Sequence, residues 1–195
     1  MFIKKNLFLI LSIILTSLVF SCSSGGDSGG EEIVLGKQVS NGMTYTLDDF
    51  TASPVKFKKL REYKTDQLTF AKNVYYGFRK FEDPVDYEIR FFDSHADAIN
   101  GETLVRERAG TKEEIKLDKD EATFTEGLKD VRHCFGEAQG EGGVAGGGAG
   151  IGGHCINSKY RNYVIQGNII LLCQGMDINS SYRNCEKLLN LLIKE

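Results

Sequence analysis

The sequence lacks an excess of positive charge. Its 24 Lys and Arg residues face 27 Asp and Glu residues, which gives a net charge of -3 at pH 7. Proteins that bind nucleic acid neutralise its phosphates with clustered cations, so this balance disfavours nucleic acid as a partner. The sequence also lacks, after its first twenty residues, any apolar stretch long enough to span a bilayer. Neither class of protein is therefore expected from the body of the chain.

A third absence concerns residues 23–32, which contain no apolar side chain. A segment with nothing to bury cannot be ordered by packing, so we expect it to act as a flexible tether. Ten residues of this Gly/Ser-rich type reach roughly 17 Å root-mean-square. The tether is expected to run from residue 22 to 32, and the rest of the chain, residues 33–195, is long enough for one domain with its own hydrophobic core.

The first 22 residues have the features of an export signal. Lys4 and Lys5 form a positive head, Leu7 to Phe20 form a short apolar run, and Ser21 supplies a small residue before Cys22. The last four residues, VFSC, resemble the lipobox of bacterial lipoproteins, in which the cysteine is acylated and becomes the mature N-terminus. The resemblance implies cleavage of residues 1–21, acylation of Cys22, and export to a lipid bilayer at the cell surface or periplasmic face. The alternative is an uncleaved membrane anchor with an incidental cysteine.

The remaining four cysteines all fall in the last third of the chain. In an exported protein an even number of cysteines suggests disulfides, here two, and spacing leaves three pairings open. We favour Cys134 with Cys155, across a glycine-rich loop at residues 136–153, and Cys173 with Cys185, which would join a strand to a helix. Each bond would contribute about 3 kcal/mol by closing a short loop in the unfolded chain.

Two hairpins, each followed by a helix, define the expected fold. Alternating apolar residues between Val74 and Phe91 predict an antiparallel pair with one buried and one solvated face and with Pro84 in the loop. Tyr160–Gln166 and Ile169–Cys173 predict central strands, apolar on both faces, around a Gly167-Asn168 turn. We therefore expect an α+β domain with an antiparallel sheet of about five strands and helices packed on it.

Caps and spacing place the helices. Thr46 begins a short helix that Pro54 ends, and Ser94 begins another, with Asp97 completing its capping box and Gly101 interrupting it. Apolar residues at helical spacing predict a closing helix at about Asn179–Ile193. The charged residues from Glu102 to Glu121 are expected to be exposed.

The C-terminal part also resembles small exported lipoproteins of unknown role. These end in a hairpin with a Gly-Asn turn, a cysteine on the strand and a cysteine on an amphipathic helix, features carried here by residues 165–169, Cys173 and Cys185. This resemblance implies no activity.

The glycine-rich loop carries two patterns associated with ligands. Gly148-x-Gly150-x-x-Gly153 matches a dinucleotide fingerprint by letter, but no strand precedes it and no helix follows it, so we do not expect nucleotide binding. His133-Cys134 and His154-Cys155 flank the loop and offer the ligand types of a zinc site. Adjacent residues of an extended chain point to opposite sides, so disulfide formation is favoured over metal, and we expect no cofactor. A variant keeps the disulfide and leaves His133 and His154 as neighbouring metal ligands.

Two further segments have a functional and a structural interpretation. Residues 93–97, DSHAD, contain the letters of a hydrolase triad, but residues one or two apart on a helix do not face each other, so a helix cap explains them better. Residues 55–63, with Lys64, carry five cations. These cations could form a basic patch that binds anionic headgroups or an acidic partner. They could instead lie on the solvated face of a strand or helix, which is the interpretation we favour.

The sequence as a whole predicts a membrane-anchored lipoprotein that serves as a binding or structural component of the cell envelope. Its expected partners are the bilayer, through Cys22, and an envelope protein or small ligand. The alternative is an envelope hydrolase or metal-dependent enzyme that uses His95, His133 or His154. A pocket in which at least two of these histidines converge, or one histidine with a carboxylate, would favour the enzyme.

Overall fold

The computed structural model describes residues 33–64, 66–68, 70–111, 115–116, 120–123, 125 and 158–192. All of them belong to one compact unit that begins at Ile33. Several predicted features lie outside the described residues, namely the signal, Cys22, the tether, the glycine-rich loop at 136–153, and the two His-Cys pairs at His133-Cys134 and His154-Cys155. None of the described helices is long and apolar enough to cross a membrane.

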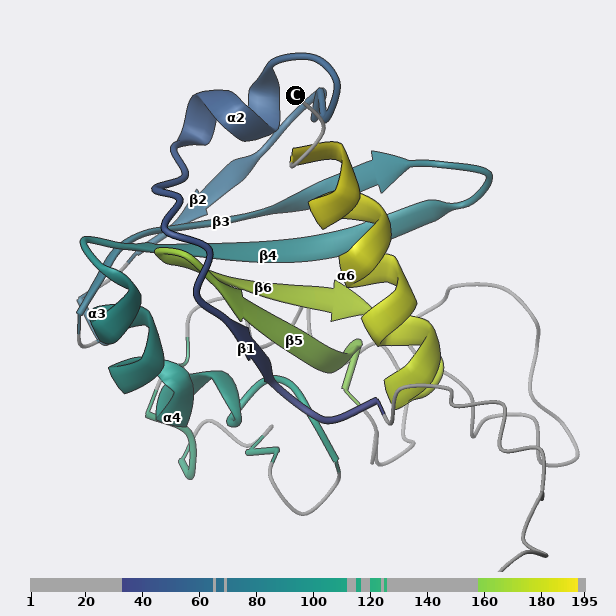
Figure 1. The fold of residues 1–195 in the computed structure, drawn as a ribbon. Coiled ribbons are helices and arrows are strands. Elements are labelled where there is room, and N and C mark those ends of the chain that lie inside the picture. The colour runs from purple at the N-terminus through teal and green to yellow at the C-terminus, as the bar shows by residue number, and fades with distance from the viewer. Residues whose placement is uncertain are drawn as a thin grey trace, which may run out of the picture. The chain divides into compact units, whose positions relative to one another are not determined.

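The described fold is α+β, and its centre is a six-stranded sheet (Figure 1). The strands lie side by side in the order β1-β5-β6-β4-β3-β2. Their bounds are β1 Lys37–Val39, β2 Arg61–Tyr63, β3 Ala71–Lys80, β4 Pro84–Phe92, β5 Tyr160–Gln166 and β6 Ile169–Gln174. Four of the five neighbouring pairs are antiparallel, whereas β1 runs parallel to β5. The expected α+β class is confirmed, but the sheet is mixed rather than wholly antiparallel and has six strands where about five were expected.

Both predicted hairpins are confirmed. β3 pairs with β4 so that Gly77 lies opposite Tyr87, and Pro84 opens β4 opposite Lys80 rather than lying in the loop as expected. β5 and β6 pair around Gly167, whose φ is +53°. β4 then pairs with β6, so the two hairpins join into one sheet, with β5 and β6 in its interior.

The helices begin where the sequence places their caps. α2 (Leu47–Thr51) follows a capping box between Thr46 and Asp49. α3 (His95–Asn100) follows Ser94, whose side chain accepts a hydrogen bond from the Asp97 N–H at 3.1 Å, and Gly101 separates it from α4 (Glu102–Val105). α6 (Ile178–Leu192) lies within a residue of its expected bounds at each end. The hairpin-then-helix order occurs twice, as predicted.

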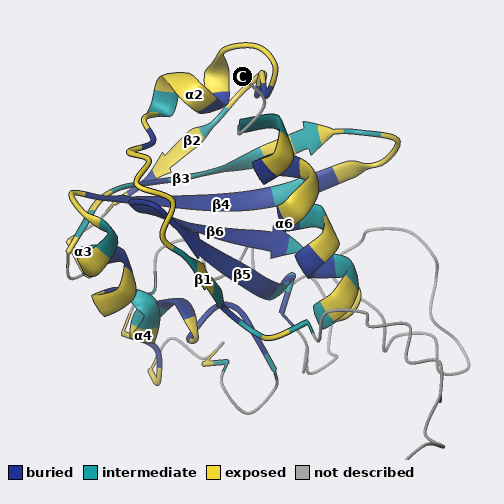
Figure 2. Cartoon of the chain, viewed as in Figure 1, coloured by how far each residue is buried: buried dark blue, intermediate teal, exposed yellow. Residues whose placement is uncertain are grey.

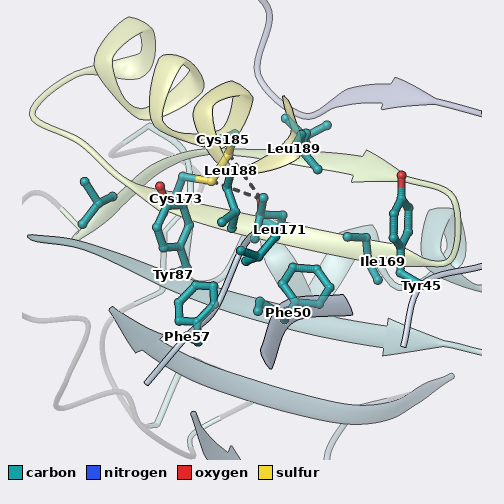
Figure 3. Packing of buried hydrophobic residues seen from close by; sticks show 14 of the residues in the cluster. Tyr45, Phe50, Phe57, Tyr87, Ile169, Leu171, Cys173, Cys185, Leu188 and Leu189 are labelled. Carbon is teal, nitrogen blue, oxygen red and sulfur yellow. Dashed lines mark hydrogen bonds between the residues drawn. A yellow bond between two sulfur atoms is a disulfide. The ribbon is translucent and has the colours of Figure 1, made fainter. Parts of the chain in front are cut away.

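The two faces of the sheet carry separate hydrophobic clusters. α6 and α2 lie over one face, where they bury Tyr87, Ile169, Leu171 and Cys173 (Figures 2 and 3). Ala98 of α3 and Val105 of α4 pack with Ile170, Leu172 and Tyr163 in the second cluster. Successive residues of a strand point to opposite faces, so the consecutive apolar residues of β6 must be covered on both sides.

A disulfide joins the central strand β6 to α6. The Sγ atoms of Cys173 and Cys185 are 2.00 Å apart and their Cα atoms 5.5 Å apart, and both residues are fully buried. Figure 3 shows the pair within the cluster, next to Leu188 and Tyr87. The prediction that these two sulfurs share one interface is confirmed.

The β5–β6 turn provides a test of this architecture. A Cβ at Gly167 would lie 2.4 Å from the Met43 carbonyl oxygen, whereas a Cβ at Gly42, whose φ is also positive, would meet nothing within 4 Å. Both substitutions to alanine incur left-handed strain of about 1–2 kcal/mol, but only Gly167→Ala adds a steric clash, worth about 1–3 kcal/mol. Denaturant unfolding is expected to show the greater loss for Gly167→Ala, and equal losses would contradict this packing.

Candidate functional site

Three charged side chains are buried together on the face of the sheet opposite α6. Glu88 Oε1 lies 2.8 Å from Arg90 Nε, and Glu88 Oε2 lies 2.7 Å from Arg108 Nη2. None of these side chains is more than 1% exposed. We call Glu88, Arg90 and Arg108 the buried ion cluster.

Two elements bring the buried ion cluster together. Glu88 and Arg90 lie on the same face of β4, opposite Leu172 and Ile170 of β6. Arg108 follows α4, where its N–H donates to the Val105 carbonyl at 2.9 Å, and the next residue, Ala109, forms a parallel bridge with Tyr160 of β5. The ion pair therefore joins the segment after α4 to the middle of the sheet.

Aromatic rings extend the buried ion cluster towards the surface. The Arg108 guanidinium lies 5.2 Å from the centre of the Tyr63 ring, which stacks on Tyr76 at 4.1 Å with 11° between the planes. Arg61 lies 6.0 Å from the Tyr76 ring, on the exposed side. Such contacts between cations and aromatic faces are worth about 0.5–2 kcal/mol each. The stack connects β2 with the interior of the domain.

Burial lowers the pKa of both arginines, whereas the charge of Glu88 raises it, and the balance differs between Arg90 and Arg108. Burial lowers the pKa of Arg90, and the carboxylate of Glu88 only partly opposes this effect. Burial also disfavours the charged form of Arg108, but Glu88 together with Tyr63 and Tyr160 raises its pKa above the ordinary value. An arginine keeps its proton at neutral pH in either case. Glu88 therefore holds two permanent charges, and its own oxygens are both occupied.

The sequence did not reveal this cluster. The alternation in β4 predicted a solvated face for Glu88 and Arg90, and Arg108 was expected to be exposed, but all three are buried. Glu107 was also expected at the surface and is 5% exposed. Alternation along β4 distinguishes its apolar face from its polar face. It does not show that a later segment of the chain covers the polar face and supplies an opposite charge.

Residues 93–97, which contain the letters of a hydrolase triad, form the helix start that was favoured from the sequence. Ser94 Oγ donates to Asp97 Oδ2 at 2.6 Å, which completes the cap of α3. His95 is half-buried, and its Nδ1 lies 2.6 Å from the Gly167 carbonyl oxygen. Because a carbonyl only accepts, Nδ1 is the donor, and His95 joins α3 to the β5–β6 turn.

The other histidine candidates, His133 and His154, lie outside the described residues. Within the part of the chain that the structure describes, no three His, Cys, Asp or Glu side chains are grouped so that they would hold a metal ion.

A second feature with functional potential is a row of cations along the β2 edge of the sheet. Val55, Phe57 and Tyr63 are buried, while the cations between them are exposed, which is the solvated face favoured from the sequence. The chain before β2 runs beside the end of β3, because Arg79 Nε donates to the Val55 carbonyl at 2.5 Å. We define the cationic edge as the six cations of residues 55–61 and 76–80: Lys56, Lys58, Lys59, Arg61, Arg79 and Lys80.

Comparison with known proteins places the chain in a family. A family model described as a family of unknown function, DUF6810, matches residues 46–194. The chain belongs to DUF6810. The span matched by the DUF6810 model runs from the cap of α2 through α6 and contains the buried ion cluster, the cationic edge and the disulfide. No curated protein matches the chain, and no solved structure does.

The buried ion cluster makes a prediction about stability. Glu88→Gln keeps the side-chain shape but removes the carboxylate that faces two buried guanidinium groups, so we expect a loss of about 3–5 kcal/mol in the free energy of unfolding. Asp93→Asn, which removes the exposed Lys72–Asp93 pair with side chains 64% and 75% exposed, is the control and is expected to lose at most about 1 kcal/mol. Similar losses in the two variants, measured by denaturant unfolding, would refute the role of Glu88.

A second prediction concerns alkaline pH. Burial, followed by the charge of Glu88, raises the pKa of Tyr160 well above its ordinary value. The unfolded chain therefore releases this phenol proton first, near pH 10, and stability should fall as the pH rises above that value, by about 1.4 kcal/mol per pH unit for one proton. Tyr160→Phe should flatten the decline between about pH 9 and pH 11. Parallel curves for the two proteins would contradict the shift.

Proposed function

We propose that this member of DUF6810 is an exported lipoprotein, held at a membrane through an acyl group on Cys22, whose domain serves as a binding component of the cell envelope. The protein would face the cell surface or the periplasm, with an envelope protein or a small ligand as its partner. Residues 1–21 would be removed, and residues 22–32 would tether the domain to the bilayer.

The observation that carries this proposal is the Cys173–Cys185 disulfide. It lies in the core, with its sulfurs 2.00 Å apart, and ties α6 to a central strand. Disulfides persist outside the cytosol and are rare within it, where thiols are kept reduced. A structural disulfide therefore agrees with the export signal and the VFSC sequence that ends at Cys22, two features at opposite ends of the chain.

A binding role is favoured because the described side chains that could act as catalytic groups have structural contacts instead. Both oxygens of Glu88 engage arginines, Ser94 and Asp97 cap α3, and His95 bonds to the Gly167 carbonyl. A nucleophile or general base requires a reactive side chain directed at a substrate. Recognition through the surface of a stable, tethered domain requires only exposed groups, and a tether raises their local concentration near the membrane.

The acylation site can be tested in cells of the native host. Cys22→Ser should abolish incorporation of a labelled fatty acid and release the protein from the membrane fraction, because serine lacks the thiol that forms the thioether. Ser23→Ala, one residue away, should leave both properties unchanged. Retention of the label in Cys22→Ser, or its absence from the unaltered protein, would overturn the proposal.

A further inference from the structure

We propose that the cationic edge binds the anionic phospholipid headgroups of the bilayer in which the acyl group is anchored. The inference rests on the proposed function, since it names the surface by which the tethered domain would contact the bilayer. It adds an orientation: the β2 edge of the sheet would face the lipid, and β1, the opposite edge strand, which follows the tether in the chain, would lie farther from it.

The six cations of the cationic edge lie in two segments that are neighbours in space. Arg61 lies opposite Tyr76 in the β2–β3 pairing. Further along, the Lys59 carbonyl lies so close to Gly77 that a Cβ there would be 2.6 Å from it. The bond from Arg79 to the Val55 carbonyl closes the far end. Residues 55–61 and 76–80 therefore form one continuous border.

The charge of this border has one sign. Neither segment contains an acidic residue, although the whole chain carries a net charge of -3. Among the described residues, no ion pair involves Lys56, Lys58 or Lys59. Each Lys or Arg close to an anionic membrane contributes roughly fivefold in affinity. Basic clusters that bind anionic membranes contain about 4–8 Lys and Arg residues, and the cationic edge contains six.

The neighbouring acids offset these cations only in part. Asp86 pairs with Lys159 at 2.5 Å, whereas Glu62, which accepts a hydrogen bond from Asn73 at 2.8 Å, keeps its negative charge beside Arg61. Glu82 and Asp83 are exposed at the tip of the β3–β4 hairpin, beyond Lys80. The positive charge therefore weakens towards the tip of the hairpin. Removing the charges of Glu82 and Asp83 should accordingly strengthen binding to an anionic surface.

An aromatic side chain accompanies the cations. Phe78 lies in β3, between Gly77 and Arg79, and is 52% exposed. Aromatic rings are favoured at the boundary between headgroups and acyl chains, and lysine stems reach along apolar surface while their charges stay in water. A lipid surface offers both anionic headgroups for the cations and an apolar layer for the exposed Phe78 ring. An acidic protein surface would engage only the cations, so we favour lipid.

Geometry also favours a bilayer over a discrete ligand. The cations are spread along one border of the sheet, and a bilayer presents many phosphates whose positions adjust to the protein. A tether of eleven Gly/Ser-rich residues would span roughly 18 Å root-mean-square and at most about 40 Å when fully extended, which would keep the domain close to the bilayer. Weak individual contacts are sufficient at that effective concentration.

The test uses residues 22–195 with Cys22→Ser, so that no acyl chain contributes and the compact unit from Ile33 onward stays whole. The chain contains no tryptophan, and Phe78→Trp therefore supplies a single fluorescent reporter at the edge. With phosphatidylcholine vesicles that contain phosphatidylglycerol, we expect a blue shift of the tryptophan emission. The shift should be absent with phosphatidylcholine alone and should disappear in about 1 M salt, where the screening length is about 3 Å.

Two triple variants that lose the same charge distinguish binding through the cationic edge from binding through the net charge of the domain. Replacing Lys58, Lys59 and Lys80 by Gln should weaken vesicle binding on the order of 100-fold. Replacing Lys72, Arg183 and Lys187 by Gln, which removes the same charge from exposed sites away from the edge, should weaken it less than tenfold. Glu82→Gln with Asp83→Asn should strengthen it. Unchanged circular dichroism would show that each variant is folded.

Three results would overturn the inference: equal binding to neutral and anionic vesicles, equal effects of the two triple variants, or no vesicle binding while the same lysines capture an acidic polypeptide. The last result would assign the edge to an acidic protein partner. Because the tested chain carries no acyl group, a failure here leaves the acylation of Cys22 standing, and a failure of fatty-acid labelling leaves vesicle binding standing.

Discussion

The fold depends on the β5–β6 hairpin, which has no face suited to water. From Ile169 to Cys173 every residue of β6 is fully buried, so the sheet must be covered on both sides. α6 covers one side and α3 with α4 the other. β4 and β5 flank β6, and the strands at the two edges of the sheet, β1 and β2, are short. The Cys173–Cys185 disulfide then fixes α6 on this hairpin at the point where burial is most complete.

The buried ion cluster, on the side of the sheet away from α6, contains three charges that are costly to remove from water. Glu88 faces both Arg90 and Arg108 and offsets one of the two positive charges. The charge of Glu107 also acts on Arg90, and the Tyr63 ring lies against the Arg108 guanidinium. Buried ion pairs are often no more stabilising than apolar packing of similar volume. In this domain the pair between Arg108 and Glu88 joins the segment after α4 to β4.

Much of the fold was predictable from the sequence because its signals are local. Alternation gave the hairpins, Ser94 and Thr46 gave the helix starts, and helical spacing gave α6. β1 was missed because Lys37–Val39 is three residues long and half polar, and its parallel pairing with β5 is set by tertiary contact. The buried ion cluster was missed for the same reason, since Arg108 meets Glu88 from a distant part of the chain. The cationic edge was visible as composition, but its continuity with β3 was not.

The proposed export, the disulfide and the proposed lipid contact of the cationic edge form one account, in which the core would be oxidised because the domain would lie outside the cytosol. The most direct measurement is peptide mapping of the protein from native cells, with free thiols alkylated at lysis and no reductant added. The account predicts that Cys173 and Cys185 are recovered in one disulfide-linked species. Recovery of both residues as separate alkylated peptides would contradict it.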